Sequence, residues 1–98
     1  MNIYTPGIWT VKPGREDDFV EAWRDLATRT QSDFPGAQAV LMRDRDTPNR
    51  FASTGPWQSM DQIQRWRESS TFSDGVDRIR ELLDSFEAHT LDEFVVIE

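Results

Sequence analysis

The order of strand-forming and helix-forming segments constrains this chain more than any other feature of its sequence. Residues typical of strands occupy Gly7 to Val11, Ala37 to Asp44, Phe51 to Trp57 and Leu91 to Ile97. One helical segment separates the first two, and another separates the last two. This β-α-β-β-α-β order over residues 1–98 predicts a single α+β domain of ferredoxin-like type. Its antiparallel sheet carries both helices on one face.

Local signals set the expected helix ends. The first helix should begin at Arg15, bury Phe19, Trp23 and Leu26, and end at Phe34-Pro35-Gly36. The second begins at the capping box Ser59-Met60-Asp61-Gln62. We expect it to break at Ser69-Ser70 and to restart. A stripe at helical spacing then predicts the core residues Phe72, Val76, Ile79, Leu83 and Phe86.

The sheet face away from the helices needs a cover. A chain of 98 residues buries only about 60–65% of its unfolded surface. An open sheet face with apolar residues on it favours association. We therefore predict a homodimer in which two sheets face each other and Leu91 to Ile97 contributes to the contact.

Composition argues against several partners and sites. Eleven Lys and Arg against 18 Asp and Glu give a net charge of −7, which disfavours nucleic acid and anionic membranes as partners. The absence of cysteine removes disulfides and thiolate metal sites. The N-terminus lacks the pattern of a signal peptide, and no apolar run is long enough to span a membrane. We expect a cytoplasmic protein.

Two tryptophans lie around one predicted strand-to-helix corner. Trp57 ends a strand at Gly55-Pro56, and Trp66 lies in the helix that follows. The pair could fill the end of a small core, or it could line a cavity for a flat ligand. The pattern alone leaves both interpretations open.

Three stretches carry a resemblance to a known family. They are GIWTVKPGREDDFVEAW, PGAQAVLMRD and RFASTGPWQSMDQIQRWRES, in this order. Together they make the chain, over about residues 6 to 97, similar to the antibiotic biosynthesis monooxygenase domain family. Members of that family are small dimeric α+β barrel proteins.

The resemblance implies a pocket between sheet and helices and, in members that oxygenate anthrones or quinols, chemistry without metal, flavin or haem. Trp57 matches the family's tryptophan at the end of the third strand, and is a candidate catalytic residue. An asparagine four residues before that tryptophan and a tyrosine six residues after it are replaced here by Ser53 and Ile63. The haem-degrading branch has an asparagine and a histidine where this chain has Gly7 and Val76, which argues against haem degradation.

Further site candidates come from residue chemistry. His89 is the only histidine, and it is either a general base or an ordinary residue near the start of a strand. Arg43 could face a substrate, or could face solvent or a dimer interface. Trp9 and Ile8 point to opposite faces of their strand, and either could face the pocket. Trp66, Ser53, Arg43 and Trp9 are the candidate substrate-binding residues. The charges of Arg65 and Arg67 suggest a solvated helix face, and a lone histidine gives no metal site.

Two function classes follow. The first is a cofactor-independent monooxygenase, or a related isomerase or cyclase, acting on an aromatic or quinone-like small molecule. The second is a non-catalytic dimeric module of the same fold that binds a small ligand.

Overall fold

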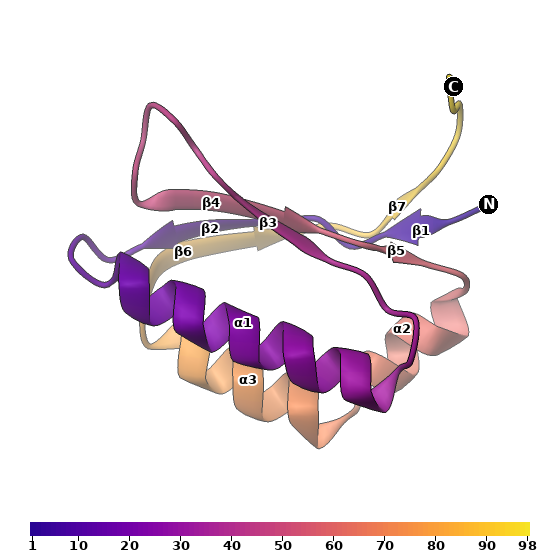
Figure 1. The fold of residues 1–98 in the computed structure, drawn as a ribbon, viewed down its shortest axis with the longest axis horizontal. Helices are drawn as coiled ribbons and strands as arrows, with labels where there is room; N and C mark the ends of the chain where they lie inside the picture. Colours follow the sequence, from indigo (N-terminus) through magenta and orange to yellow (C-terminus); the bar gives the residue numbers. More distant parts are fainter.

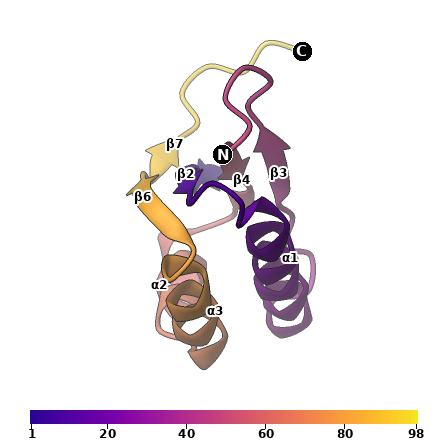
Figure 2. The same ribbon diagram turned by 90° about the vertical axis from the view of Figure 1, so that its left-hand side faces the viewer.

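The computed structural model describes residues 1–98 and contains the predicted antiparallel sheet. Its strands are β2 (Gly7–Val11), β3 (Val40–Arg43), β4 (Arg50–Thr54) and β6 (Leu83–Ala88), in the order β3-β4-β2-β6. Helices α1 (Glu16–Asp33) and α3 (Ser70–Arg80) lie side by side beneath one face (Figures 1 and 2). The predicted ferredoxin-like fold, with both helices on one face, is confirmed.

A second, smaller sheet extends the first at one end. It contains β5 (Pro56–Trp57), β1 (Ile3–Tyr4) and β7 (Leu91–Asp92), in that order. Pro6, which has no backbone N–H, lies between β1 and β2. Gly55 lies between β4 and β5, and the close approach of the Gln38 carbonyl oxygen leaves no room for a β carbon there. These two breaks divide the predicted strands between the two sheets.

The prediction for the end of the chain is wrong. Helix α3 ends at Arg80, and Leu83 and Phe86 belong to β6 instead of the helical stripe. Strand β6 pairs with β2, with Phe86 opposite Trp9. Spacings of three and four residues fit a helix, but here the free edge of β2 supplies backbone hydrogen bonds to the segment. Beyond β6, only Leu91–Asp92 of the predicted last strand is a strand.

The helix start signals are confirmed. The side-chain oxygen of Ser59 accepts a hydrogen bond of 3.3 Å from the backbone N–H of Gln62, and α2 (Met60–Arg67) begins there. The hydroxyl of Ser69 accepts one of 3.2 Å from the N–H of Phe72 and starts α3. Such a cap typically stabilises a helix by about 1 kcal/mol. The Ser69 cap lies at the predicted break between α2 and α3.

The apolar core lies between the sheet and the helices and is densest toward one end. Val11, Phe19 and Ile79 have no solvent exposure, and the ring of Phe19 lies 4.9 Å from that of Phe51. Phe19, Ala22, Leu26 and Thr30 are the buried residues of α1, at spacings of three and four. The core holds α1 and α3 against the sheet, and the remaining space between these layers is hollow.

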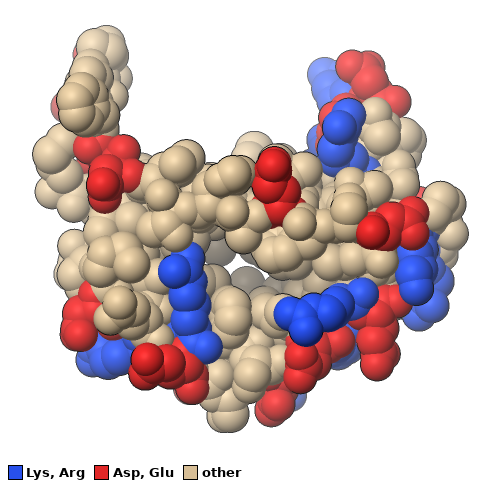
Figure 3. Space-filling view, turned by 180° about the vertical axis from the view of Figure 1, so that it is seen from behind, with Lys and Arg blue, Asp and Glu red and all other residues tan.

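The other sheet face is open. Val40 and Met42 on this face are about half exposed, at 47% and 48%. Beyond β7 the tail residues 94–97 (Phe-Val-Val-Ile) are 56–90% exposed and extend from the body (Figure 1). Figure 3 shows a largely uncharged surface between the two projecting ends of the molecule, interrupted near its middle by an acidic side chain. None of the three helices has the length and apolar character needed to cross a membrane.

Candidate functional site

A cavity of about 370 Å³ lies between the sheet and the helices. Figure 3 shows its hollow from behind, below the sheet. Sites for small molecules usually measure about 300–1,000 Å³. The structure brings five predicted site residues to its lining, which are Trp9, Ser53, Trp57, Trp66 and His89.

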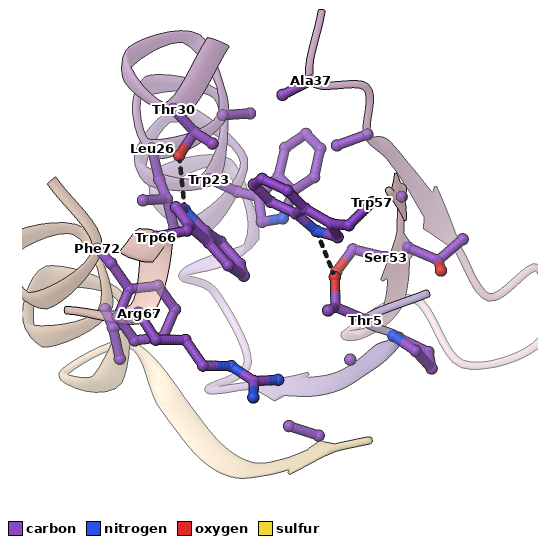
Figure 4. Close-up of a pocket in the computed structure, with 18 of the residues that line it drawn as sticks. Thr5, Trp23, Leu26, Thr30, Ala37, Ser53, Trp57, Trp66, Arg67 and Phe72 are labelled. Atoms are coloured by element: carbon purple, nitrogen blue, oxygen red, sulfur yellow. Dashed lines mark hydrogen bonds between the residues drawn. The ribbon is translucent and has the colours of Figure 1, made fainter. Parts of the chain in front are cut away.

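Trp57 and Trp66 form one wall of this cavity. Their ring centroids are 5.0 Å apart, at an angle of 32°. A ligand ring held between two aromatic rings would need a separation of about 7 Å, twice a typical carbon contact. The indoles therefore pack on each other and present a shared surface (Figure 4). Phe34 and Phe72 pack edge-on against the ends of this pair.

Trp9 lies on the sheet side of the cavity. It is 6% exposed, and its ring stacks on that of Phe86 with centroids 4.1 Å apart. Ile8 points to the open sheet face, since the exposure of β2 alternates along the strand. Of the two residues that could face the pocket, Trp9 does so and Ile8 does not.

Hydroxyl groups hold the three indoles in place. The indole N–H of Trp9 donates to the hydroxyl oxygen of Ser53 at 2.9 Å. Those of Trp57 and Trp66 donate to Thr5 at 3.3 Å and Thr30 at 3.0 Å (Figure 4). The indole donors are consequently used within the protein. Each hydroxyl keeps its own hydrogen, because a serine or threonine oxygen can accept and donate at once.

His89 lies just after β6, at the edge of the cavity. Its backbone N–H donates to the carbonyl of Pro6 at 3.0 Å, which fixes the main chain. Its Nε2 is 3.5 Å from a carboxylate oxygen of Glu87, and its side chain is 52% exposed. Glu87 pairs with Ile8, which points to the open sheet face, so the imidazole lies at the sheet edge between that face and the cavity.

Arg43 lies outside the cavity. It is at the far end of β3 from the residues that contribute to the lining, and its Nε donates to the carbonyl of Pro48 at 2.6 Å. Its guanidinium lies over the ring of Phe51, 5.3 Å from the centroid. The sequence left open whether Arg43 faces a substrate or faces solvent or a dimer interface. The structure places it away from the cavity lining.

Gly7 and Val76 both line the cavity, and neither can coordinate iron. Ile63 is fully buried and does not reach the lining. The chain has no group of three or more His, Asp or Glu side chains placed to hold a metal ion. His89 is the one side chain in the lining with a nitrogen suited to a metal.

The sequence missed three contributors. Trp23 and Thr30 line the cavity from α1, and their spacing of seven residues could have placed them on the same side as Leu26. Arg67 also lines it, although its neighbourhood in the sequence predicted a solvated helix face. That prediction describes Arg65, which pairs with Asp61 at 3.4 Å.

The charges of the lining differ from those of the protein. The chain has 18 acidic residues, and none of them lines the cavity, whereas Arg67, Arg80 and His89 do. Asp44 lies away from the cavity, on the loop after β3. Hydrogen bonds from the backbone N–H groups of Asp46 and Thr47 hold its pKa below the usual value. The cavity is thus a basic, aromatic compartment within an acidic protein.

Comparisons with known proteins agree with this fold. The family model described as antibiotic biosynthesis monooxygenase matches residues 8–78. No curated protein matches the sequence significantly. The structure of SnoaB, a cofactor-independent oxygenase from Streptomyces nogalater, superposes with a TM-score of 0.88 at 20% identity, covering 98% of this chain and 96% of that one.

Two further structures superpose as well. For a conserved protein from Methanosarcina mazei Go1 the TM-score is 0.87 at 17% identity, covering 96% of this chain and 94% of that one. For the PA3566 protein of Pseudomonas aeruginosa it is 0.81 at 18% identity, covering 96% and 95%. At such identities the structural likeness shows the fold.

Proposed function

The chain belongs to the antibiotic biosynthesis monooxygenase family, and we propose that it is a cofactor-independent monooxygenase acting on a flat aromatic or quinone-like small molecule. One observation carries the proposal. Trp57 and Trp66 form one wall of the cavity and Trp9 lies on its sheet side, and the three indoles are fixed by hydrogen bonds to Thr5, Thr30 and Ser53. A rigid apolar site of this kind suits a planar ring system. The structural likeness to SnoaB, a cofactor-independent oxygenase, supports this class of reaction.

The proposed reaction takes its electrons from the substrate. An anthrone-type CH₂ group loses a proton, and the resulting anion reduces dioxygen and combines with it as a peroxide. Cleavage of the O–O bond leaves one oxygen atom in the product as a ketone and releases the other as water. The balance is CH₂ plus O₂ giving C=O plus H₂O. The protein must accept a proton, stabilise an oxyanion and hold the ring.

His89 accepts the proton in this proposal. It is the histidine of the cavity lining, and its Nε2 lies 3.5 Å from Glu87, which can stabilise the imidazolium that forms. Because the side chain is half exposed, the proton can pass on to solvent. Arg43 has no part in this scheme.

Ser53 stabilises the developing oxyanion. Its oxygen accepts the 2.9 Å hydrogen bond from Trp9, and its own hydrogen can donate to a substrate oxygen. The Trp9 bond polarises this hydroxyl and strengthens the second bond. Trp57 and Trp66 give one apolar surface for the ring. The site thus uses Ser53 in place of the amide found in the family's anthrone oxygenases.

An oxygen electrode tests the proposal with a model anthrone such as dithranol. Purified protein should raise oxygen consumption above the protein-free rate in proportion to its concentration. General base catalysis is worth about 10²- to 10⁴-fold, so His89→Ala should lower the protein-dependent rate at least tenfold. Equal rates for the two proteins would remove His89 from the mechanism.

A non-catalytic binding module is the second candidate function. It is favoured by Ile63, which replaces the family's tyrosine and is buried in the core. This alternative predicts that aromatic ligands bind without turnover. Absence of protein-dependent oxygen consumption together with saturable binding would select it.

We propose that the working unit is a cytoplasmic homodimer. The exposed apolar residues of the open sheet face and of the tail 94–97 support a partner copy facing the sheet. In such a dimer the cavity of each subunit stays on the helix side of its own sheet.

A further inference from the structure

We propose that Arg67 is the ligand-recognition residue of the cavity and selects flat aromatic molecules that carry an anionic oxygen, such as a carboxylate or an ionised phenol. The inference deepens the proposed function and rests on it for the aromatic part of the ligand. It names a residue at the end of α2 that no sequence signal indicated.

The first argument is position. Trp66 points into the cavity wall, and Arg67 is the next residue, the last of α2. Figure 4 shows its guanidinium extending into the open part of the cavity, below Trp66. One of its terminal nitrogens donates to the hydroxyl of Thr90 at 2.8 Å, which holds the group beside the end of β6. The arginine is therefore directed toward the cavity and steadied there.

The second argument is charge. Seven of the eleven lysines and arginines have a carboxylate within 4.0 Å. Arg67 has none, and its one hydrogen-bond partner, Thr90, is neutral. Arg80, the other arginine of the lining, pairs with Asp77 at 3.8 Å. Of the two arginines that line the cavity, Arg67 is therefore the one without a carboxylate within 4.0 Å.

The third argument is the exclusion of acidic residues. None of the 18 Asp and Glu side chains lines the cavity. An apolar cavity excludes carboxylates in any case, because an unpaired buried charge is costly, so this absence supports an anionic ligand only together with the guanidinium of Arg67. An anionic ligand benefits from the absence, since a like charge in the lining would oppose binding.

The chemistry follows from the guanidinium. It carries five N–H donors in a planar fork and keeps its charge at any physiological pH. One donor is used by Thr90, so others can bond the oxygen of a ligand whose ring rests on the Trp57–Trp66 wall. Charge-assisted bonds of this type are about twice as strong as neutral ones. Arg67 thus supplies selectivity for charge, and the indoles supply affinity for the ring.

The test compares 2-naphthoate with its neutral isostere 2-naphthamide, titrated into the full-length protein and followed by tryptophan fluorescence. We expect the parent protein to bind naphthoate about tenfold more tightly than naphthamide, the usual size of a charged hydrogen bond. Arg67→Gln should abolish this preference and leave naphthamide binding unchanged. Arg67→Lys should retain part of it, because the charge remains and the fork is lost.

Arg65→Gln is the matched control. Arg65 lies on the same helix two residues earlier, pairs with Asp61 and does not line the cavity. This variant should keep the full preference for naphthoate. A nitronaphthol, whose absorption reports its ionisation, separates the two sources of the anion. If the parent protein binds the nitronaphthol as its phenolate and Arg67→Gln does not, Arg67 recognises ionised phenols as well as carboxylates. If the two proteins bind the phenolate equally, recognition by Arg67 is confined to carboxylates.

Three results would overturn the assignment. The preference for naphthoate could persist in Arg67→Gln, or both ligands could weaken equally, which would indicate a structural role. The parent could also bind naphthamide as tightly as naphthoate, and the aromatic cavity would then stand without an anion site. Failure of both ligands to bind would reject the aromatic ligand class of the proposed function together with the role of Arg67.

Discussion

Replacing Ser53 with alanine removes one oxygen atom from the most enclosed part of the site. Ser53 is 9% exposed and Trp9 is 6% exposed, so the indole N–H of Trp9 would lose its acceptor in a buried place. A buried donor without a partner costs about 1–3 kcal/mol. In a domain of this size each kcal/mol lowers the melting temperature by about 4–8 °C. We therefore expect Ser53→Ala to melt at least 4 °C below the parent.

Circular dichroism measures this loss through urea and thermal unfolding, and it does not depend on the altered environment of Trp9. Ser85→Ala is the matched control, because Ser85 is an exposed serine on β6, in the same sheet. Surface substitutions of this kind change stability by less than about 0.5 kcal/mol. The reasoning is refuted if Ser53→Ala and Ser85→Ala are equally stable. In that case the Trp9–Ser53 bond would contribute nothing to the rigidity of the cavity.

The remaining predictions concern assembly, cofactors and the strand break. Sedimentation at micromolar concentration should report about twice 11.4 kDa, and a charge placed in the tail by Val96→Glu should weaken the dimer; a monomeric parent would contradict this. Hemin titration should give no Soret shift that saturates at one equivalent per chain, since neither Gly7 nor Val76 can bind iron. Extensive dialysis against EDTA should leave oxygen consumption unchanged, and loss restored by a metal would contradict the mechanism. Gly55→Ala should destabilise the fold by at least 1 kcal/mol in urea unfolding, because its β carbon meets the backbone of Gln38; parent-like stability would show that the two segments can separate.

Most of the fold could be predicted because local signals and the global arrangement agree. Pro6 separates β1 from β2, and Ser59 and Ser69 start α2 and α3, each through a backbone effect that depends on nearby residues. The end of the chain could not be predicted in the same way. The segment after Arg80 has helical spacing, and its pairing with β2, more than 70 residues earlier, makes it a strand. Such long-range hydrogen bonding leaves no local signal.

The site was predictable in its aromatic part. Trp57 and Trp66 flank one corner, and that proximity in sequence is kept in space. The partners of the indoles come from distant elements, as Thr30 of α1 does for Trp66, and no spacing rule joins them. Arg67 was missed because an arginine in a charged helix end predicts solvation. Only the position of α2 beside the end of β6 directs it toward the cavity.

Labelled dioxygen gives the most direct test of the central claim, which is that this aromatic cavity inserts one oxygen atom into a flat substrate. Dithranol is incubated with the protein under ¹⁸O₂, and the quinone product is analysed by mass spectrometry. We predict one ¹⁸O atom per molecule of product, formed at a rate proportional to protein concentration and at least tenfold lower for His89→Ala. Labelled product that forms no faster than in the protein-free control would contradict the claim and leave the cavity as a binding site without catalysis.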